Sequence, residues 1–211
     1  MNFLLIDNHP LILVGYVAIL QKRYQGAMFY KCSTIAEVTA VLNSGVKMDV
    51  VVMDCNIGSP KQRQVSKGIE WIRAVKQANA TAKIILITSH SEILFVYHIH
   101  KQVLPDGLLI KSEVSLDVLR QALEVVLTGG RFYSDEVVLQ VDKMNRNTLM
   151  REQRNMQILL FLSQGYRARE ISELLFISEA AVHRRIALMK KNFRATDSTG
   201  LIKIALNKGF V

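Results

Sequence analysis

The apolar residues of this chain gather in short runs that recur through its first half. Five of these runs have the length of a β-strand and are nearly continuous rather than alternating: residues 2–6, 27–32, 49–54, 83–88 and 107–110. Continuous apolar runs are typical of strands buried on both faces of a parallel sheet. The segments between them have helical spacing of apolar residues, over 11–23, 34–43, 68–78, 91–102 and 115–127. This alternation predicts an α/β domain with right-handed crossovers.

The pattern changes after residue 127. Two adjacent glycines in "TGGRFYSDEVV" are followed by a polar, weakly periodic stretch, which predicts a linker over 129–150 with a short helix near 135–144. Helical spacing returns further on, where Gly165 is placed to end one helix and Ser178 to cap the start of another. We therefore expect a small all-α domain over 151–211.

The last long helix of this domain has one apolar side and several basic ones. Its predicted buried positions are Val182, Ile186 and Met189, and after Glu179 it carries no acid through Phe193. A surface helix that is merely solvated usually balances its basic residues with acidic ones, so this helix favours an anionic partner. A short helix, a tight turn and a basic helix predict a helix-turn-helix, whose second helix fits the major groove of double-stranded DNA.

Charge and composition strengthen this interpretation. The chain has 27 Lys and Arg against 18 Asp and Glu, and residues 151–211 carry 11 basic and five acidic side chains, so they hold +6 of the net charge of +9. Such an uneven distribution indicates contact with a polyanion. The two cysteines have no metal-like spacing, and no apolar run is long enough to span a membrane, so we expect a soluble protein in a reducing cytoplasm.

Polar residues stand where the predicted strands end. Asp7 and Asn8 follow the first strand, Asp54 ends the third, Thr88 ends the fourth and Lys111 follows the fifth. The carboxyl ends of parallel strands share one edge of the sheet, where ligands bind. A carboxylate there can accept a phosphoryl group, a lysine can pair with its oxygens, and a hydroxyl can hydrogen-bond to it.

Transfer of a phosphoryl group requires a divalent cation with hard oxygen ligands. We expect Mg²⁺ to be held by Asp7, Asn8, Asp54 and the backbone carbonyl of Asn56. The sequence therefore predicts a phosphoryl-transfer site at this edge of the sheet.

Four stretches together resemble the receiver domain of bacterial two-component response regulators: "LLIDNHPL" (4–11), "DVVVMDCNI" (49–57), "ILITS" (85–89) and "PDGLLIKSEV" (105–114). The resemblance covers residues 1–128 and implies a flavodoxin-like, doubly wound parallel sheet of five strands. It also implies that Asp54 is the phospho-acceptor, Thr88 the switch hydroxyl and Lys111 the phosphate-contacting lysine. A histidine kinase or a small phosphodonor would supply the phosphoryl group.

The order of receiver, linker and helix-turn-helix resembles the LuxR/NarL class of response regulators. "GYRAREISELLFISEAAVHRRI" (165–186) follows the central pattern of that class, and the tail over 196–211 resembles its last helix, which commonly dimerises. The resemblance implies a homodimeric transcription regulator that is not an enzyme. We assign base edges to two residues of the basic helix, His183 and Arg184, and phosphates to Arg185, Lys190, Arg167 and Arg169.

The receiver part of the chain departs from the family pattern at three places. Asn8 stands where the family has a second acid, Leu108 stands where an aromatic residue usually precedes the lysine, and the loop over 56–68 is long and basic, with Lys61, Arg63 and Lys67. These departures motivate an alternative, in which the receiver is a dimerisation or partner-binding platform that works without phosphorylation. A phosphatase-like or nucleotide-binding α/β enzyme is a further alternative, but no glycine-rich phosphate loop or nucleophile–base pair supports it.

Overall fold

The computed structural model describes residues 1–55 and 65–211, together with the side chains outside 56–70. The chain divides into two compact units. The first contains Met1–His90 and Ile99–Val137, and the second contains Ser91–His98 and Val138–Val211.

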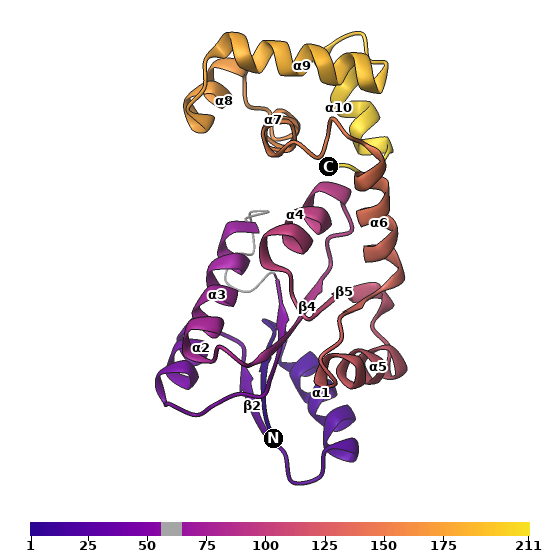
Figure 1. Cartoon of the computed structure of the whole chain (residues 1–211). Coiled ribbons are helices and arrows are strands. Elements are labelled where there is room, and N and C mark those ends of the chain that lie inside the picture. The colour runs from indigo at the N-terminus through magenta and orange to yellow at the C-terminus, as the bar shows by residue number, and fades with distance from the viewer. Residues whose placement is uncertain (56–64) are drawn as a thin grey trace. The chain divides into compact units, whose positions relative to one another are not determined.

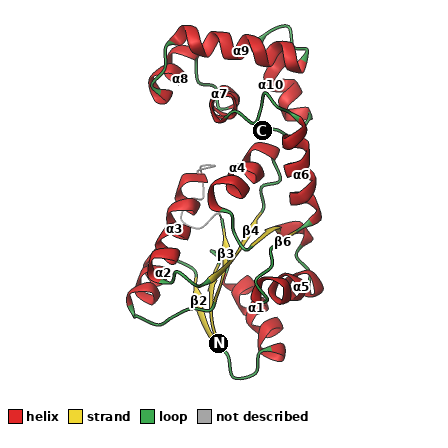
Figure 2. Cartoon of the chain, in the orientation of Figure 1, coloured by secondary structure: helices red, strands yellow, loops and turns green. Residues whose placement is uncertain are grey.

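The first unit is built on a parallel sheet with the strand order β2-β1-β3-β4-β5-β6 (Figures 1 and 2). The strands are β1 (Asn2–Ile6), β2 (Met28–Cys32), β3 (Val50–Asp54), β4 (Lys83–Thr88), β5 (Gly107–Ile110) and β6 (Phe132–Tyr133). The chain moves outward from β1 to β2 and then returns to β3 on the other side of β1. This reversal between β1 and β3 creates the point where parallel α/β sheets bind ligands.

Helices cover both faces of this sheet. They are α1 (Pro10–Arg23), α2 (Ile35–Asn43), α3 (Val65–Ala78) and α5 (Leu116–Leu127), together with the last part of α4 (Ile93–Val103), whose residues up to His98 belong to the second unit. Apolar residues of α1 and α5 form one core layer with alternate residues of the strands, among them Phe3, Leu5, Val50, Val52 and Ile85. The four inner strands β1, β3, β4 and β5 are buried on both faces, which explains why their sequences are continuously apolar.

The five strands and five helices predicted over residues 1–127 are confirmed, with ends that differ by at most three residues. The sheet nevertheless has six strands and not five. The sixth, β6, has only two residues and pairs parallel to β5, with Leu108 opposite Tyr133. It lies inside the segment predicted as linker, as does α6 (Asp135–Arg146), which agrees with the short helix expected there.

The second unit has an all-α core formed by α7 (Gln153–Ser163), α8 (Ala168–Leu175), α9 (Glu179–Phe193) and α10 (Ser198–Asn207). Gly165 has a φ of 91° just after α7, the left-handed conformation that a glycine adopts most easily. The hydroxyl of Ser178 accepts a hydrogen bond of 3.2 Å from the Ala181 N–H and caps α9. Both predicted helix boundaries are thus confirmed.

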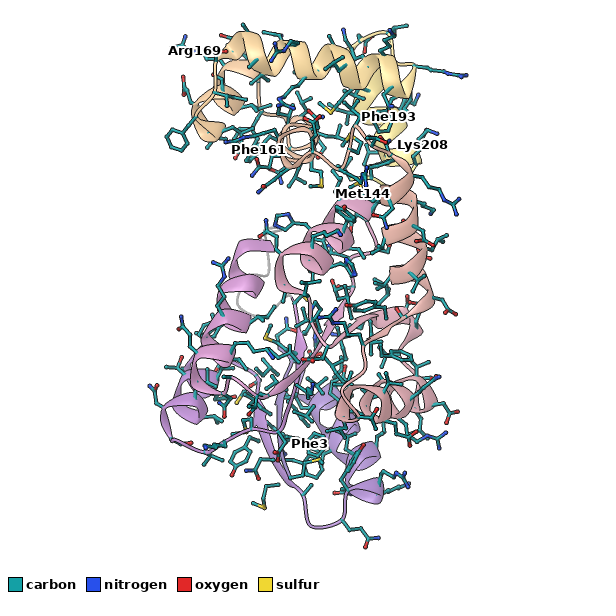
Figure 3. All side chains as sticks on the ribbon, in the orientation of Figure 1. Phe3, Met144, Phe161, Arg169, Phe193 and Lys208 are labelled. Atoms are coloured by element: carbon teal, nitrogen blue, oxygen red, sulfur yellow. The ribbon has the colours of Figure 1, made fainter. Side chains whose placement is uncertain are left out.

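Helix α9 is fixed to the core of the second unit by the residues predicted to be buried. Val182, Ile186 and Met189 are all buried. At the end of α9, the ring of Phe193, which is labelled in Figure 3, meets that of Phe210 edge-on with 5.1 Å between centroids. Anchoring on one side leaves the opposite side of α9 exposed. None of the helices in the described part of the chain is both long and apolar enough to cross a bilayer.

Candidate functional site

Four functional residues predicted from the sequence lie at the carboxyl edge of the sheet in the first unit. Asp7 directly follows β1, Asp54 ends β3, Thr88 ends β4 and Lys111 directly follows β5. These four strands are consecutive neighbours in the sheet. The fold thus brings together side chains that are up to 104 residues apart in sequence.

Lys111 joins the two carboxylates. Its Nζ lies 2.9 Å from Asp7 Oδ2 and 2.6 Å from Asp54 Oδ2. The acidic side chains are only 1% and 2% exposed, whereas that of Lys111 is 23% exposed. Burial by itself lowers the pKa of Lys111, but its hydrogen bonds to Asp54 and Asp7 and their charges outweigh this effect and raise the pKa above its ordinary value. The lysine therefore stays charged at neutral pH between two buried acids.

The other oxygen of Asp7 is held by His9, a residue that the sequence analysis did not single out. Asp7 Oδ1 accepts a hydrogen bond of 2.9 Å from the His9 N–H and lies 3.1 Å from His9 Nδ1. Because α1 begins at the next residue, these contacts fix the turn from β1 into α1. The position of His9 two residues after an acid, at the head of a helix, is the sequence signal for such a turn.

Tyr16 of α1 is a second neighbour of the acids that the sequence analysis did not identify. Its side chain is buried, and burial, followed by the charges of Asp7 and Asp54, raises the pKa of its hydroxyl above its usual value. Tyr16 is therefore uncharged beside the carboxylates. Its sequence gives only a helical apolar position, so its place beside the acids could be found only from the fold.

Thr88 is fully buried at the end of β4 and pairs in register with Ile110, the residue before Lys111. Its Oγ1 accepts a hydrogen bond of 3.0 Å from the His90 N–H. The hydroxyl thus stands one strand away from the lysine, and its own proton is available for a second partner. Leu108, at the position of the family's aromatic residue, is fully buried in β5.

The two acids also form a candidate site for a divalent cation. No cluster of three or more His, Cys, Asp or Glu side chains suitable for a metal occurs among the described residues; the two carboxylates present here are those of Asp7 and Asp54, which Lys111 joins. Asn8 is exposed beside them. Two carboxylates with neutral oxygen donors suit Mg²⁺, which keeps several water ligands. The carbonyl of Asn56 and the basic side chains of the loop, Lys61, Arg63 and Lys67, lie outside the described side chains.

The exposed side of α9 in the second unit carries His183 and Arg184, while Lys190 is half-buried. Arg167 and Arg169 are exposed at the start of α8, where Arg169 forms an exposed pair with Glu173 at 3.4 Å. His183 lies 3.5 Å from Glu179, one turn earlier on the same helix, and this pair is also exposed. Exposed pairs of this kind are weak, so these basic groups can exchange partners readily.

Arg185 differs from the other basic residues of α9 because its guanidinium turns toward α7. Its Nη1 lies 2.6 Å from Glu152 Oε2 and 2.9 Å from Asn155 Oδ1. Asn155 is fully buried and uses its Nδ2 to donate to the Leu149 carbonyl at 2.8 Å. In the structure Arg185 thus ties α9 to the start of α7, while its assignment to DNA phosphates stays a prediction.

Known proteins resemble this chain both over its first part and over nearly its whole length. The family model described as the response regulator receiver domain matches residues 3–124. Transcriptional regulatory protein MctR of Rhizobium johnstonii is 28% identical, over 99% of this chain and 94% of that protein. Response regulator UvrY of Escherichia coli (strain K12) is 25% identical, over 99% of this chain and 94% of that protein.

A solved structure of two RcsB dimers bound to two parallel DNAs has the same fold, with a TM-score of 0.65 and 19% identity over 97% of each chain. The family model covers more than half of the present chain and includes Asp7, Asp54, Thr88 and Lys111. The resemblance inferred from the sequence is thereby confirmed, and the chain belongs to the response regulator receiver domain family.

Proposed function

We propose that this protein is a transcription regulator of a two-component system, whose binding to DNA is controlled by phosphorylation of Asp54. The observation that carries this proposal is the placement of Lys111 between Asp54 and Asp7 at the carboxyl edge of the sheet. The relatives support it, because MctR is named a transcriptional regulatory protein and UvrY a response regulator, and each aligns with nearly the whole chain.

The chemistry follows from the three residues at the sheet edge. A carboxylate oxygen of Asp54 attacks the phosphorus of the donor, the bond from phosphorus to the donor's leaving group breaks, and an acyl phosphate forms. Lys111 pairs with one phosphoryl oxygen, while Thr88 donates its free hydroxyl proton to another. Asp7, Asn8, Asp54 and the backbone carbonyl of Asn56 are the groups that would hold Mg²⁺, whose charge would neutralise that of the phosphoryl oxygens.

The second unit would read double-stranded DNA through α9. His183 and Arg184 lie on its exposed side, and we assign them to base edges. Lys190, Arg167 and Arg169 would bind backbone phosphates, where their positive charge is favourable whatever the base sequence. Arg185 would hold α9 against α7.

The same proposal extends to partners and cellular location. A histidine kinase or a small phosphodonor would supply the phosphoryl group, and a homodimer would read two half-sites of a duplex. The protein would work in the cytoplasm, and it would turn over no external metabolite. Phosphorylation would shift an equilibrium between receiver conformations through Thr88 and so change the DNA-binding state.

Phosphoryl uptake tests the first part of the proposal. We expect the wild-type protein, incubated with Mg²⁺ and acetyl phosphate, to gain the mass of one phosphoryl group, and the Asp54→Asn variant to gain none. Asn8→Asp should lower the Mg²⁺ concentration needed for half-maximal uptake, because it adds a carboxylate beside Asp7. Equal labelling of wild type and Asp54→Asn in intact-protein mass spectrometry would show that Asp54 is not the acceptor.

A further inference from the structure

Hydrogen bonds join the segment around Lys111 to the start of α6. The short helical turn Lys111–Glu113 follows β5 directly, and β6 runs beside β5 immediately before α6 begins. Backbone bonds join the two segments, from the Phe132 N–H to the Asp106 carbonyl at 3.0 Å and from the Ser134 N–H to the Leu108 carbonyl at 3.1 Å. In Figure 2, β6 lies at one edge of the sheet, and the chain continues from it into α6.

Side chains extend this connection on both sides of Lys111. The Ser134 hydroxyl accepts a hydrogen bond of 3.1 Å from the Ile110 N–H, immediately before the lysine. The same hydroxyl donates to Glu113 Oε2, two residues after the lysine. The second carboxylate oxygen of Glu113, Oε1, accepts a hydrogen bond of 3.0 Å from the Glu136 N–H in the first turn of α6.

The position of Glu113 strengthens these hydrogen bonds. Its carboxylate bonds to the N-terminus of a helix, where the free N–H groups and the helix dipole favour a negative charge. Ser134 is only 4% exposed, so water competes little for its hydroxyl. Hydrogen bonds in which one partner is charged are stronger than neutral ones. The turn that holds Lys111 and the first turn of α6 are thus one connected structure.

This connection is relevant because the sequence offers no aromatic side chain at position 108, three residues before Lys111. Leu108 occupies that position and is fully buried. Lys111, which now bonds to Asp54 and Asp7, must reorient when a phosphoryl group is attached to Asp54. A movement of its backbone would reach Glu113 within two residues.

We propose that Glu113, acting with Ser134, couples the position of Lys111 to the first turn of α6 and so transmits the state of Asp54 to the helix that leads into the second unit. This inference rests on the proposed function, because it assigns the route by which phosphorylation is sensed. Glu113 is a positioning residue, since it touches neither Asp54 nor its phosphoryl group. Its carboxylate therefore determines the response to phosphorylation and not the phosphorylation itself.

The first test compares Glu113→Ala with Asp117→Ala in the full chain. Asp117 is a nearby acid whose side chain is 79% exposed and lies 3.3 Å from Arg120, one turn along the same helix. We expect both variants to take up one phosphoryl group from acetyl phosphate. For a DNA duplex selected with the wild-type protein, the change in affinity on phosphorylation should be at least fivefold smaller in Glu113→Ala, and unaltered in Asp117→Ala.

A double variant shows whether Glu113 and Ser134 belong to one route. Ser134→Ala should also reduce the change in DNA affinity on phosphorylation. The double variant Glu113→Ala/Ser134→Ala should reduce this change no further than either single variant does. A full response to phosphorylation in Glu113→Ala, with normal phosphoryl uptake, would overturn the inference. Absence of uptake by the wild type would instead contradict the proposed function.

Amide hydrogen exchange tests the coupling between Lys111 and the first turn of α6 in the unphosphorylated protein. Asp54→Asn removes one of the two carboxylates that hold Lys111, and we expect it to change the exchange rate of amides 134–138 at least threefold. In the Glu113→Ala background the same substitution should leave these rates within a factor of about 1.5 of that background. An equal change in both backgrounds would exclude Glu113 as the coupling residue.

Discussion

Replacing Lys111 with Met is expected to lower the free energy of unfolding of the first unit by about 3 kcal/mol. The substitution keeps much of the side-chain volume but removes the positive charge between two carboxylates that are 1% and 2% exposed. Two adjacent, buried negative charges are then left without their common partner. Guanidinium unfolding followed by the fluorescence of Trp71, the only tryptophan, measures this unit directly.

Two comparisons separate this effect from a general cost of losing a lysine. Lys83→Met removes a lysine that lies 3.3 Å from Asp106, whose side chain is 20% exposed, and should cost less than about 1 kcal/mol. Lys111→Met/Asp54→Asn should recover more than half of the loss, because only one buried carboxylate remains. Equal losses of unfolding free energy in Lys111→Met and Lys83→Met would contradict the stabilising role of Lys111 between the two acids.

Arg184→Ala is expected to weaken binding to a selected duplex by roughly 5- to 150-fold, the range for loss of a good contact to a base edge. Because Arg184 is exposed, the free energy of unfolding should change by less than about 0.5 kcal/mol. Fluorescence anisotropy of labelled DNA gives the affinity, and circular dichroism during denaturation gives the stability.

Arg185→Ala, one residue further along the helix, is the matched comparison. It removes the bonds to Glu152 and to Asn155, which is fully buried, so we expect a loss of about 1–3 kcal/mol in the stability of the second unit. If Arg184→Ala destabilised the unit while Arg185→Ala weakened DNA binding without loss of stability, the two roles would have to be exchanged.

Much of the fold was predictable because the buried strands leave a direct trace in the sequence. Continuous apolar runs ended at Asp54 and Thr88, and a parallel sheet places such ends on one edge, so the location of the candidate site followed from the topology. The helix-turn-helix was equally accessible through Gly165, Ser178 and the buried positions of α9.

The missed features depend on contacts between distant residues. β6 has two residues, too few for any periodic pattern, and its existence depends on pairing with β5. Glu113 bonds to residues 21 and 23 positions away, and Arg185 to residues 33 and 30 positions away. A charged residue in a basic helix looks the same in sequence whether or not it contacts a buried amide, so the bonds of Arg185 to Glu152 and Asn155 could be found only from the structure.

The central claim is that phosphorylation of Asp54 controls DNA binding, and one measurement tests it most directly. The affinity for a selected duplex is determined by anisotropy at fixed salt with Mg²⁺, before and after treatment with acetyl phosphate, for the wild type and for Asp54→Asn. We predict that treatment changes the wild-type dissociation constant at least fivefold and leaves that of Asp54→Asn unchanged. An unchanged constant for a wild type that carries the phosphoryl group, or an equal change in Asp54→Asn, would contradict the account.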